Sequence, residues 1–199
     1  AAIAICVYAR KKGINLLHLI DAAAPALMIA YAIGRMGCQT AGDGDWGIFN
    51  SAYISDVPGH VVPATLEQFQ QKLKENSTYF LKGSVEDASG VYTMVTERIE
   101  TSLDKVPHKS FRGPRFLPTW MFAFTYPHNV NEDGILLPNC EGKYCRALPL
   151  PVFPTPFYEI VACFILFFFL WSIRKKINAP GVMFCIYLIL NGIERFLVE

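Results

Sequence analysis

The stretch FYEIVACFILFFFLWSIRKK, residues 157–176, decides the fold class of this chain. Apart from Glu159 near its start, it carries no charge until the basic triplet Arg174 to Lys176. A bilayer core requires roughly 20 mostly apolar residues in a helix. The alternative is a buried core helix of a soluble protein. A helix that is apolar all round and bordered by basic residues favours the membrane, so we predict a span over 156–173.

Two further segments qualify as spans, residues 14–35 and 179–198, and residues 1–9 look like the end of another. The predicted fold class is therefore an all-α polytopic membrane bundle, with three full spans and one partial span and an α+β or irregular extracytoplasmic insertion. Both ends of the chain lie in apolar patterns, so we expect further spans on each side. The net charge of +1 gives no footprint for binding nucleic acid.

The orientation follows from the two Arg-Lys-Lys triplets, Arg10 to Lys12 and Arg174 to Lys176, each of which lies in a short turn between apolar segments. Short basic loops stay in the cytoplasm. The charge-rich segment 48–152 is then expected on the extracytoplasmic side of the membrane. We accordingly divide the chain into a membrane part over 1–47, a head domain over 48–152, and a second membrane part over 153–199.

The head domain reads as a small polar domain with few regular elements. Residues 64–76 (ATLEQFQQKLKEN) have the pattern of an amphipathic helix, and residues 90–101 (GVYTMVTERIET) suit a strand or a short helix. Cys140 and Cys145, with four residues between them, would form a disulfide in an oxidising compartment. A zinc site is the rival, but its other ligands would have to come from scattered histidines, so we favour the disulfide.

Two arginines remain inside the predicted spans, and buried charges of this kind are candidates for function. Counting about 1.5 Å per residue along each helix, Arg35 and Arg195 reach a similar depth in the outer half of the bilayer. Guanidinium groups suit bidentate binding of phosphate, so the simplest ligand at that depth is a phospholipid head group. The alternative is a structural ion pair with a nearby acid; the acids considered are Asp43, Glu159 and Glu199.

Arg35 lies in GRMGCQTAGDGDWG, residues 34–47, where five glycines would allow a tight backbone and the close approach of a ligand. We expect residues 36–47 to form a glycine-rich exit loop. Asp43 and Asp45 place two acids there, but two carboxylates alone are weak evidence for a metal, and we assign none. The alternative is a polar turn without function.

Three motifs together, GRMGCQTAGDGDWG, PTPFYE (154–159) and NGIERFLVE (191–199), resemble the prolipoprotein diacylglyceryl transferase family. The resemblance covers residues 1–49 and 154–199. It implies transfer of the sn-1,2-diacylglyceryl group of phosphatidylglycerol to the lipobox cysteine thiol of prolipoproteins, the first step of bacterial lipoprotein maturation. It implies no cofactor. The partners would be phosphatidylglycerol, membrane lipid and the signal peptides of prolipoproteins.

The resemblance also carries residue roles. The catalytic residues that it implies are Arg35, Arg195, Glu199 and Asp43, with Asp45 as a competitor for Asp43 because this loop has an extra residue. The lipid-binding residues that it implies are Arg35, Gly34, Gly47, Cys38 and Tyr158, and Glu159 would position them.

Two features depart from the family pattern. Cys38 stands where the family commonly has asparagine, and a thiol is a poorer hydrogen-bond partner. The family's His-Gly-Gly motif, whose histidine is often proposed as general base, would lie before Ala1, so we expect this segment by itself to lack activity. His18 is no substitute, because it lies at the cytoplasmic end of its span.

A different class of function is a transporter or channel segment whose arginines gate an anion. Transporters often contain repeated halves, and no internal repeat is visible in this sequence. A glycine-rich acidic loop beside an arginine also suits a site better than a scaffold. The sequence therefore favours the transferase.

Overall fold

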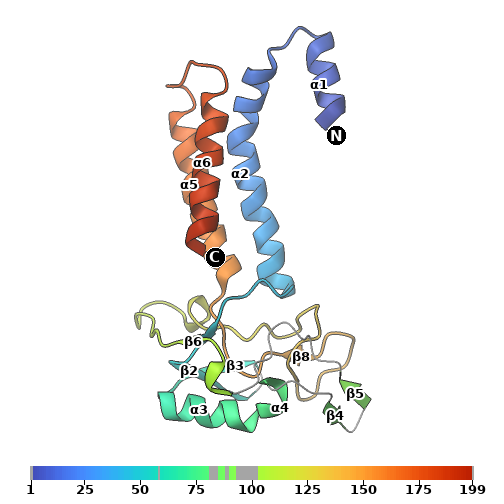
Figure 1. Cartoon of the computed structure of the whole chain (residues 1–199), viewed down its shortest axis with the longest axis vertical. Coiled ribbons are helices and arrows are strands. Elements are labelled where there is room, and N and C mark those ends of the chain that lie inside the picture. Colours follow the sequence, from blue (N-terminus) through green and yellow to red (C-terminus); the bar gives the residue numbers. More distant parts are fainter. Residues whose placement is uncertain (1, 58, 81–84, 88–89, 93–102, 199) are drawn as a thin grey trace. The chain divides into compact units, whose positions relative to one another are not determined.

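The computed structural model describes residues 2–57, 59–80, 85–87, 90–92 and 103–198. The chain divides into two compact units (Figure 1). Unit 1 contains Ala1–Gly37 and Pro156–Glu199, and unit 2 contains Cys38–Thr155. Each unit is described by itself.

Unit 1 is helical. Its helices are α1 (Ala2–Lys11), most of α2 (Leu16–Ala41), α5 (Thr155–Ile173) and α6 (Val182–Val198). The last three run side by side (Figure 1) and share one apolar core. Ala24, Met28 and Ala32 lie four residues apart on one face of α2, and they meet Cys163 of α5 and Met183 of α6. The two alanines are small, which lets the neighbouring helices approach closely at those positions.

Two helices, α2 and α5, are long and apolar enough to cross a membrane. Helix α6 has 17 residues, which is at the short limit for crossing a bilayer. Large apolar side chains also point away from the helical core, as expected for surfaces that contact lipid. These features are consistent with a membrane protein, while the count of three full spans and one partial span stays a prediction.

Helix α2 is longer than the sequence indicated. It ends at Ala41, so residues 36–41, expected in the exit loop, are helical. A glycine inside a helix costs only about 1 kcal/mol relative to alanine, too little to end a long apolar helix at Gly34 or Gly37. Gly42, the first residue after the helix, ends it instead, because its φ of +63° and the hydrogen bond from its N–H to the carbonyl of Cys38 form a left-handed C-cap. The loop proper is residues 42–47.

Unit 2 is built from short paired strands and loops. The strands are β1 (Phe49–Asn50), β2 (Tyr53–Val57), β3 (His60–Pro63), β4 (Val85–Asp87), β5 (Gly90–Tyr92), β6 (His108–Lys109), β7 (Ile135–Leu136) and β8 (Arg146–Ala147). β1 pairs with β6 in parallel, and β2–β3, β4–β5 and β7–β8 are antiparallel pairs. The helices of unit 2 are α3 (Leu66–Glu75), α4 (Ser77–Phe80), η1 (Leu103–Lys105) and η2 (Thr119–Met121).

The amphipathic helix predicted over 64–76 is confirmed as α3. Thr65 caps it, because the Thr65 hydroxyl accepts from the Gln68 N–H while the Gln68 side chain accepts from the Thr65 N–H. Phe69 and Leu73 on its inner face pack into an apolar cluster with Leu150. Of the segment 90–101, the structure describes only Gly90–Tyr92, which forms strand β5, and the rest lies outside the described residues.

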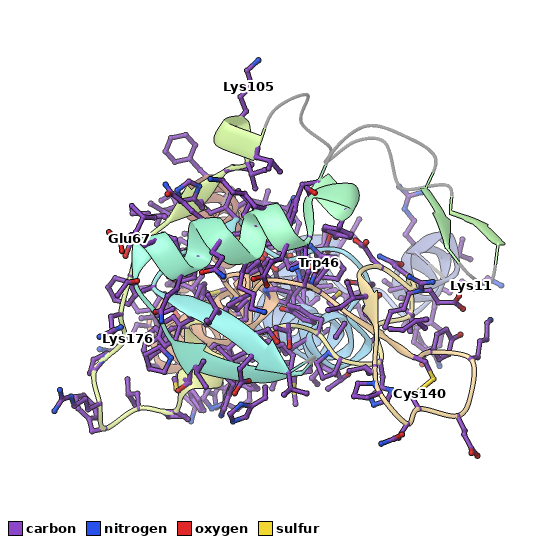
Figure 2. The ribbon with its side chains drawn as sticks, turned by 90° about the horizontal axis from the view of Figure 1, so that it is seen from below. Lys11, Trp46, Glu67, Lys105, Cys140 and Lys176 are labelled. Atoms are coloured by element: carbon purple, nitrogen blue, oxygen red, sulfur yellow. A yellow bond between two sulfur atoms is a disulfide. The ribbon has the colours of Figure 1, made fainter. Side chains whose placement is uncertain are left out.

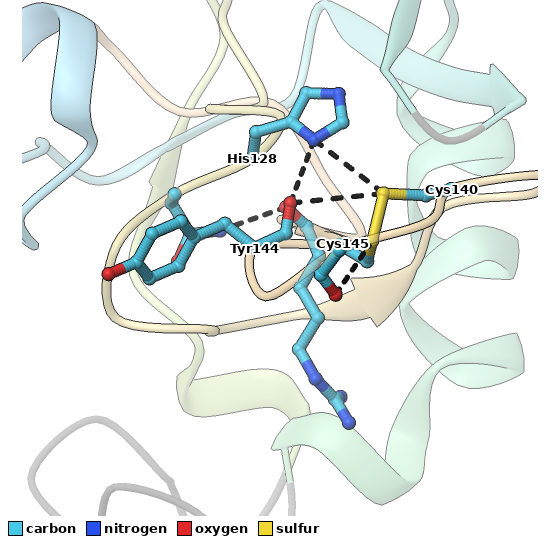
Figure 3. The surroundings of a disulfide bond; sticks show 7 residues. His128, Cys140, Tyr144 and Cys145 are labelled. Carbon is cyan, nitrogen blue, oxygen red and sulfur yellow. Dashed lines mark hydrogen bonds between the residues drawn. A yellow bond between two sulfur atoms is a disulfide. The ribbon is translucent and has the colours of Figure 1, made fainter.

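A disulfide joins Cys140 to Cys145 in the loop between β7 and β8, as the sequence favoured (Figure 2). Beside it, the Nδ1 atom of His128 lies 2.7 Å from the carbonyl oxygen of Tyr144 (Figure 3). His60 interacts with Asp56, and His108 with the carbonyl of Val106. The histidines are thus occupied separately, and both sulfurs are bonded to each other, so the zinc alternative is not supported among the described residues.

Candidate functional site

Arg35 is held by an acid from another helix. Its Nη2 donates to Oε1 of Glu159 at 3.2 Å, and its Nε forms an ion pair with Oε2 of the same carboxylate. The two side chains are only 13% and 6% exposed. The ion pair that the sequence left as an alternative is therefore present. A two-point contact of this kind fixes the plane of the guanidinium as well as its position.

Tyr31 joins the two arginines. It lies one helical turn before Arg35 on α2, and its hydroxyl accepts from Arg35 Nε at 3.2 Å and from Arg195 Nη1 at 3.3 Å. Arg195 comes from α6, so two guanidinium groups that are far apart in sequence share one oxygen. Arg195 is exposed, whereas Arg35 is mostly buried. The structure thus brings together the two arginines that the depth argument paired.

Glu194 is the least expected member of this group. It is 4% exposed, and within the described part of the chain its carboxylate oxygens have no hydrogen-bond partner. It interacts electrostatically with Glu159, Arg195 and Arg35. We call Tyr31, Arg35, Glu159, Glu194 and Arg195 the arginine cluster. Its charged groups are two cations and two carboxylates, in an apolar helical unit where such charges are costly unless they interact.

Sequence reasoning missed two of these five residues. Glu194 carries a signal, because an acid near the end of an apolar helix is a functional candidate by default. Tyr31 carries a weaker one, its spacing of four residues before Arg35 on the same helix face. A tyrosine in a span is otherwise an ordinary interfacial residue.

The acids of the 42–47 loop lie together in unit 2. The ligand atoms of Cys38, Asp43 and Asp45 all lie within 4.8 Å of one another, and both carboxylates are exposed. Exposed acidic pairs are common without a metal, and the thiol is a soft ligand unlike the oxygens that Mg²⁺ or Ca²⁺ prefers. We therefore assign no metal to this group.

The loop is fastened to unit 2 at its far end. The Gly47 N–H donates to the carbonyl of Phe153 at 2.9 Å, and the Thr155 hydroxyl donates to the carbonyl of Asp45 at 2.6 Å. A Cβ on Gly47 would lie 3.0 Å from the Thr155 methyl and 3.1 Å from the Phe153 oxygen. Close packing is thus a sufficient reason for glycine here, besides the lipid contact that the resemblance implied.

The near end of the loop is held by residues 126–131. The Val130 N–H donates to the carbonyl of Ala41 at 2.9 Å, and the Tyr126 hydroxyl donates to Gln39 at 2.9 Å. The Tyr126 ring also packs on Trp46, with 5.2 Å between ring centroids. The loop therefore has little freedom to change its path within unit 2.

The remaining predicted residues are Tyr158, Gly34 and Glu199. Tyr158 is half-buried in the first turn of α5, with its ring against Phe157. Gly34 is exposed on α2, and a Cβ there would meet nothing within 4 Å among the described residues. Glu199 lies outside the described residues.

Comparisons with known proteins agree with the motifs. The family model for prolipoprotein diacylglyceryl transferase matches residues 1–199. Two relatives, from Leptospira interrogans serovars copenhageni and Lai, are both called phosphatidylglycerol–prolipoprotein diacylglyceryl transferase, and each is 38% identical over 50 residues. That stretch is 25% of this chain and spans only 16% of either relative's length. No solved structure matches. Because the family match extends over its whole length, the chain belongs to the prolipoprotein diacylglyceryl transferase family.

Proposed function

We propose that the protein to which this chain belongs transfers the sn-1,2-diacylglyceryl group of phosphatidylglycerol to the lipobox cysteine thiol of prolipoproteins. The observation that carries the proposal is the meeting of Arg35 and Arg195 at the Tyr31 hydroxyl, with Arg35 fixed by Glu159. Membership of the transferase family supports the proposal and does not favour the transporter alternative.

The chemistry explains why two arginines are useful. The thiolate sulfur of the prolipoprotein attacks the glyceryl carbon, the bond from that carbon to the phosphate oxygen breaks, and glycerol phosphate leaves with the electron pair. The phosphate changes from a singly charged diester to a more highly charged monoester. Guanidinium groups that are already in place stabilise this growing charge more than the ground state, which lowers the barrier.

The residues of the arginine cluster would share the work unequally. Arg195 is exposed and is the group that we expect to meet the phosphate first. Arg35 is oriented by Glu159 and Tyr31, so its guanidinium keeps a fixed position and plane. On the family resemblance alone, we propose Glu199 and Asp43, or its neighbour Asp45, as catalytic acids. On the same ground we propose Gly34, Gly47, Cys38 and Tyr158 as lipid contacts.

The proposed location is the bacterial inner membrane, with residues 48–152 on the outer side. The basic turns support this orientation. The Cys140–Cys145 disulfide supports it independently, since disulfides persist in oxidising compartments such as the periplasm. The division into 1–47, 48–152 and 153–199 belongs to the same proposal.

The test is made in the full-length enzyme, with phosphatidylglycerol and a lipobox peptide as substrates. We expect Arg35→Ala and Arg195→Ala each to lower kcat/KM by at least about 100-fold, because each removes a donor to the developing charge. Arg115→Ala, which removes an exposed arginine of unit 2, is the matched control and should retain normal turnover. Normal turnover by a folded Arg35→Ala enzyme would overturn the proposal.

A further inference from the structure

Unit 1 contains a second polar feature, far from the arginine cluster. It is a cavity of about 460 Å³ formed where α2 begins and where α5 turns into α6. The volume falls within the roughly 300–1,000 Å³ of typical small-ligand sites. Asp21, on its wall, precedes Arg35 by 14 residues on α2, which corresponds to about 21 Å along the helix. The cavity is therefore separate from the proposed phosphate site.

The cavity wall carries three basic side chains and one acid among apolar and uncharged ones. Arg174, Lys175 and His18 all line it. The Arg174 guanidinium lies over the ring of Trp171, with Cζ 3.4 Å from the ring centroid, and its Nη1 donates to the Trp171 carbonyl at 2.7 Å. These contacts fix the arginine beside the cavity while leaving further N–H donors on the same plane.

Asp21, the one acid among the described residues of the wall, already accepts two hydrogen bonds. The two carboxylate oxygens of Asp21 accept from the N–H groups of Gly181, at 2.6 Å, and Phe184, at 2.9 Å, at the start of α6. A carboxylate at this place is matched by the positive end of the helix. The basic side chains are thus not neutralised by an ion pair with Asp21, and the cavity favours an anion.

An apolar surface continues from the cavity along the same helix. Phe168 lies three residues before Trp171 on α5 and is 63% exposed, and Trp171 itself is exposed. Aromatic and basic side chains together at the end of an apolar helix are typical of the membrane interface. A ligand that fits both surfaces has an anionic head and an apolar tail, which a free phosphate ion lacks.

We propose that this cavity binds the phosphate group of an anionic phospholipid, in the leaflet at the Arg174 end of the helices. Arg174 and Lys175 contact the phosphate, and the acyl chains lie along the exposed face of α5. Basic pockets between membrane helices bind lipid head groups in the same way. The site rests on the membrane spans predicted for the chain, and it does not depend on the transferase reaction.

The test uses the full-length protein in nanodiscs of phosphatidylcholine with a small share of phosphatidic acid, an anionic lipid that is not the proposed substrate. Native mass spectrometry counts the phosphatidic acid molecules retained. We expect the double variant Arg174→Gln, Lys175→Gln to retain phosphatidic acid at least about tenfold less well, because it removes both charged contacts to the phosphate.

The matched control is the double variant Lys11→Gln, Lys12→Gln. It removes the same charge from the other basic turn, away from the cavity, and should retain lipid as the unchanged protein does. Equal retention by the two double variants would overturn the proposal. Loss of retained phosphatidic acid on adding inorganic phosphate would overturn it as well, because the ligand would then be the soluble ion.

If the double variant fails to insert into the membrane, a single substitution replaces it. Lys175 is exposed, so Lys175→Gln alone should fold normally and still weaken retention measurably. The readout counts bound lipid and needs no turnover. If the unchanged protein retains lipid normally but has no transferase activity, only the proposed function is contradicted. If it is active, and the Arg174 and Lys175 variants retain as much lipid as it does, only the lipid site is contradicted.

Discussion

The arginine cluster of unit 1 and the 42–47 loop of unit 2 are built on opposite principles. In the cluster, side chains from regular helices pair across long stretches of sequence, as Arg35 does with Glu159. In the loop, the backbone itself is special, since Gly42 and Gly44 have φ angles of +63° and +102°. The first region depends on which functional groups are present, and the second on which backbone conformations are allowed.

The residues that hold the 42–47 loop in place also depend on unusual backbone conformations. Asn129 is 1% exposed, and its amide donates to the carbonyls of Asp133, at 2.8 Å, and Arg146, at 3.2 Å, while its side-chain oxygen accepts from the Asp133 N–H. Tyr126 and His128 nearby have φ angles of 44° and 62°, a region that side chains other than glycine rarely adopt. The buried amide of Asn129 therefore stabilises the strained backbone of residues 126–131, against which Gly42 packs.

The largest effect is expected in the arginine cluster. Glu159→Ala leaves the mostly buried Arg35 without its carboxylate, and breaking a buried pair from one side costs about 3–5 kcal/mol. We expect both a lower unfolding temperature in detergent and loss of transferase activity. Glu159→Gln, which keeps an acceptor oxygen, should recover most of the stability but less of the activity. Equal damage by both variants would show that charge alone matters there.

The next effect tests the loop. Gly42→Ala would place a Cβ 2.7 Å from the Asn129 Cβ at a positive φ, and we expect a loss of about 1–3 kcal/mol of folding stability. Gly37→Ala is the control, because it is helical and a Cβ there meets nothing within 4 Å among the described residues. It should be neutral or stabilising by up to about 1 kcal/mol. Denaturation followed by near-ultraviolet circular dichroism measures both, and similar losses would refute the distinction.

This contrast also explains what could be predicted from sequence. Helix geometry placed Arg35 and Arg195 at one depth, because a regular rise converts residue count into distance. The helix end at Ala41 was missed, since glycine frequency does not reveal which glycine adopts a positive φ. The support by Asn129 was likewise invisible, because its hydrogen bonds join carbonyls scattered along the chain. The roles of Tyr31 and Glu194 could not be predicted, because they depend on how three helices pack together.

A smaller effect is expected for Tyr31→Phe. It removes only the hydroxyl that accepts from both arginines, at 3.2 and 3.3 Å. Without it, Arg35 keeps Glu159 while Arg195 loses its hydrogen bond to Tyr31, so we expect kcat to fall about tenfold with little change in folding stability. A rise in KM with unchanged kcat would instead indicate that the hydroxyl matters for lipid binding before the reaction.

The smallest effect is expected at Asp56, an exposed side chain near the end of strand β2. Hydrogen bonding from His60, and then from the Val57 N–H, lowers the pKa of Asp56 below 3.8. A depressed carboxyl pKa stabilises the fold above the unfolded value and loses that contribution as pH falls through the folded one. Asp56→Asn should therefore speed hydrogen exchange at Val57 near pH 5, with the two proteins converging well below pH 3.8. A difference that persists at the acid limit would mean that the side chain acts through shape and not through charge.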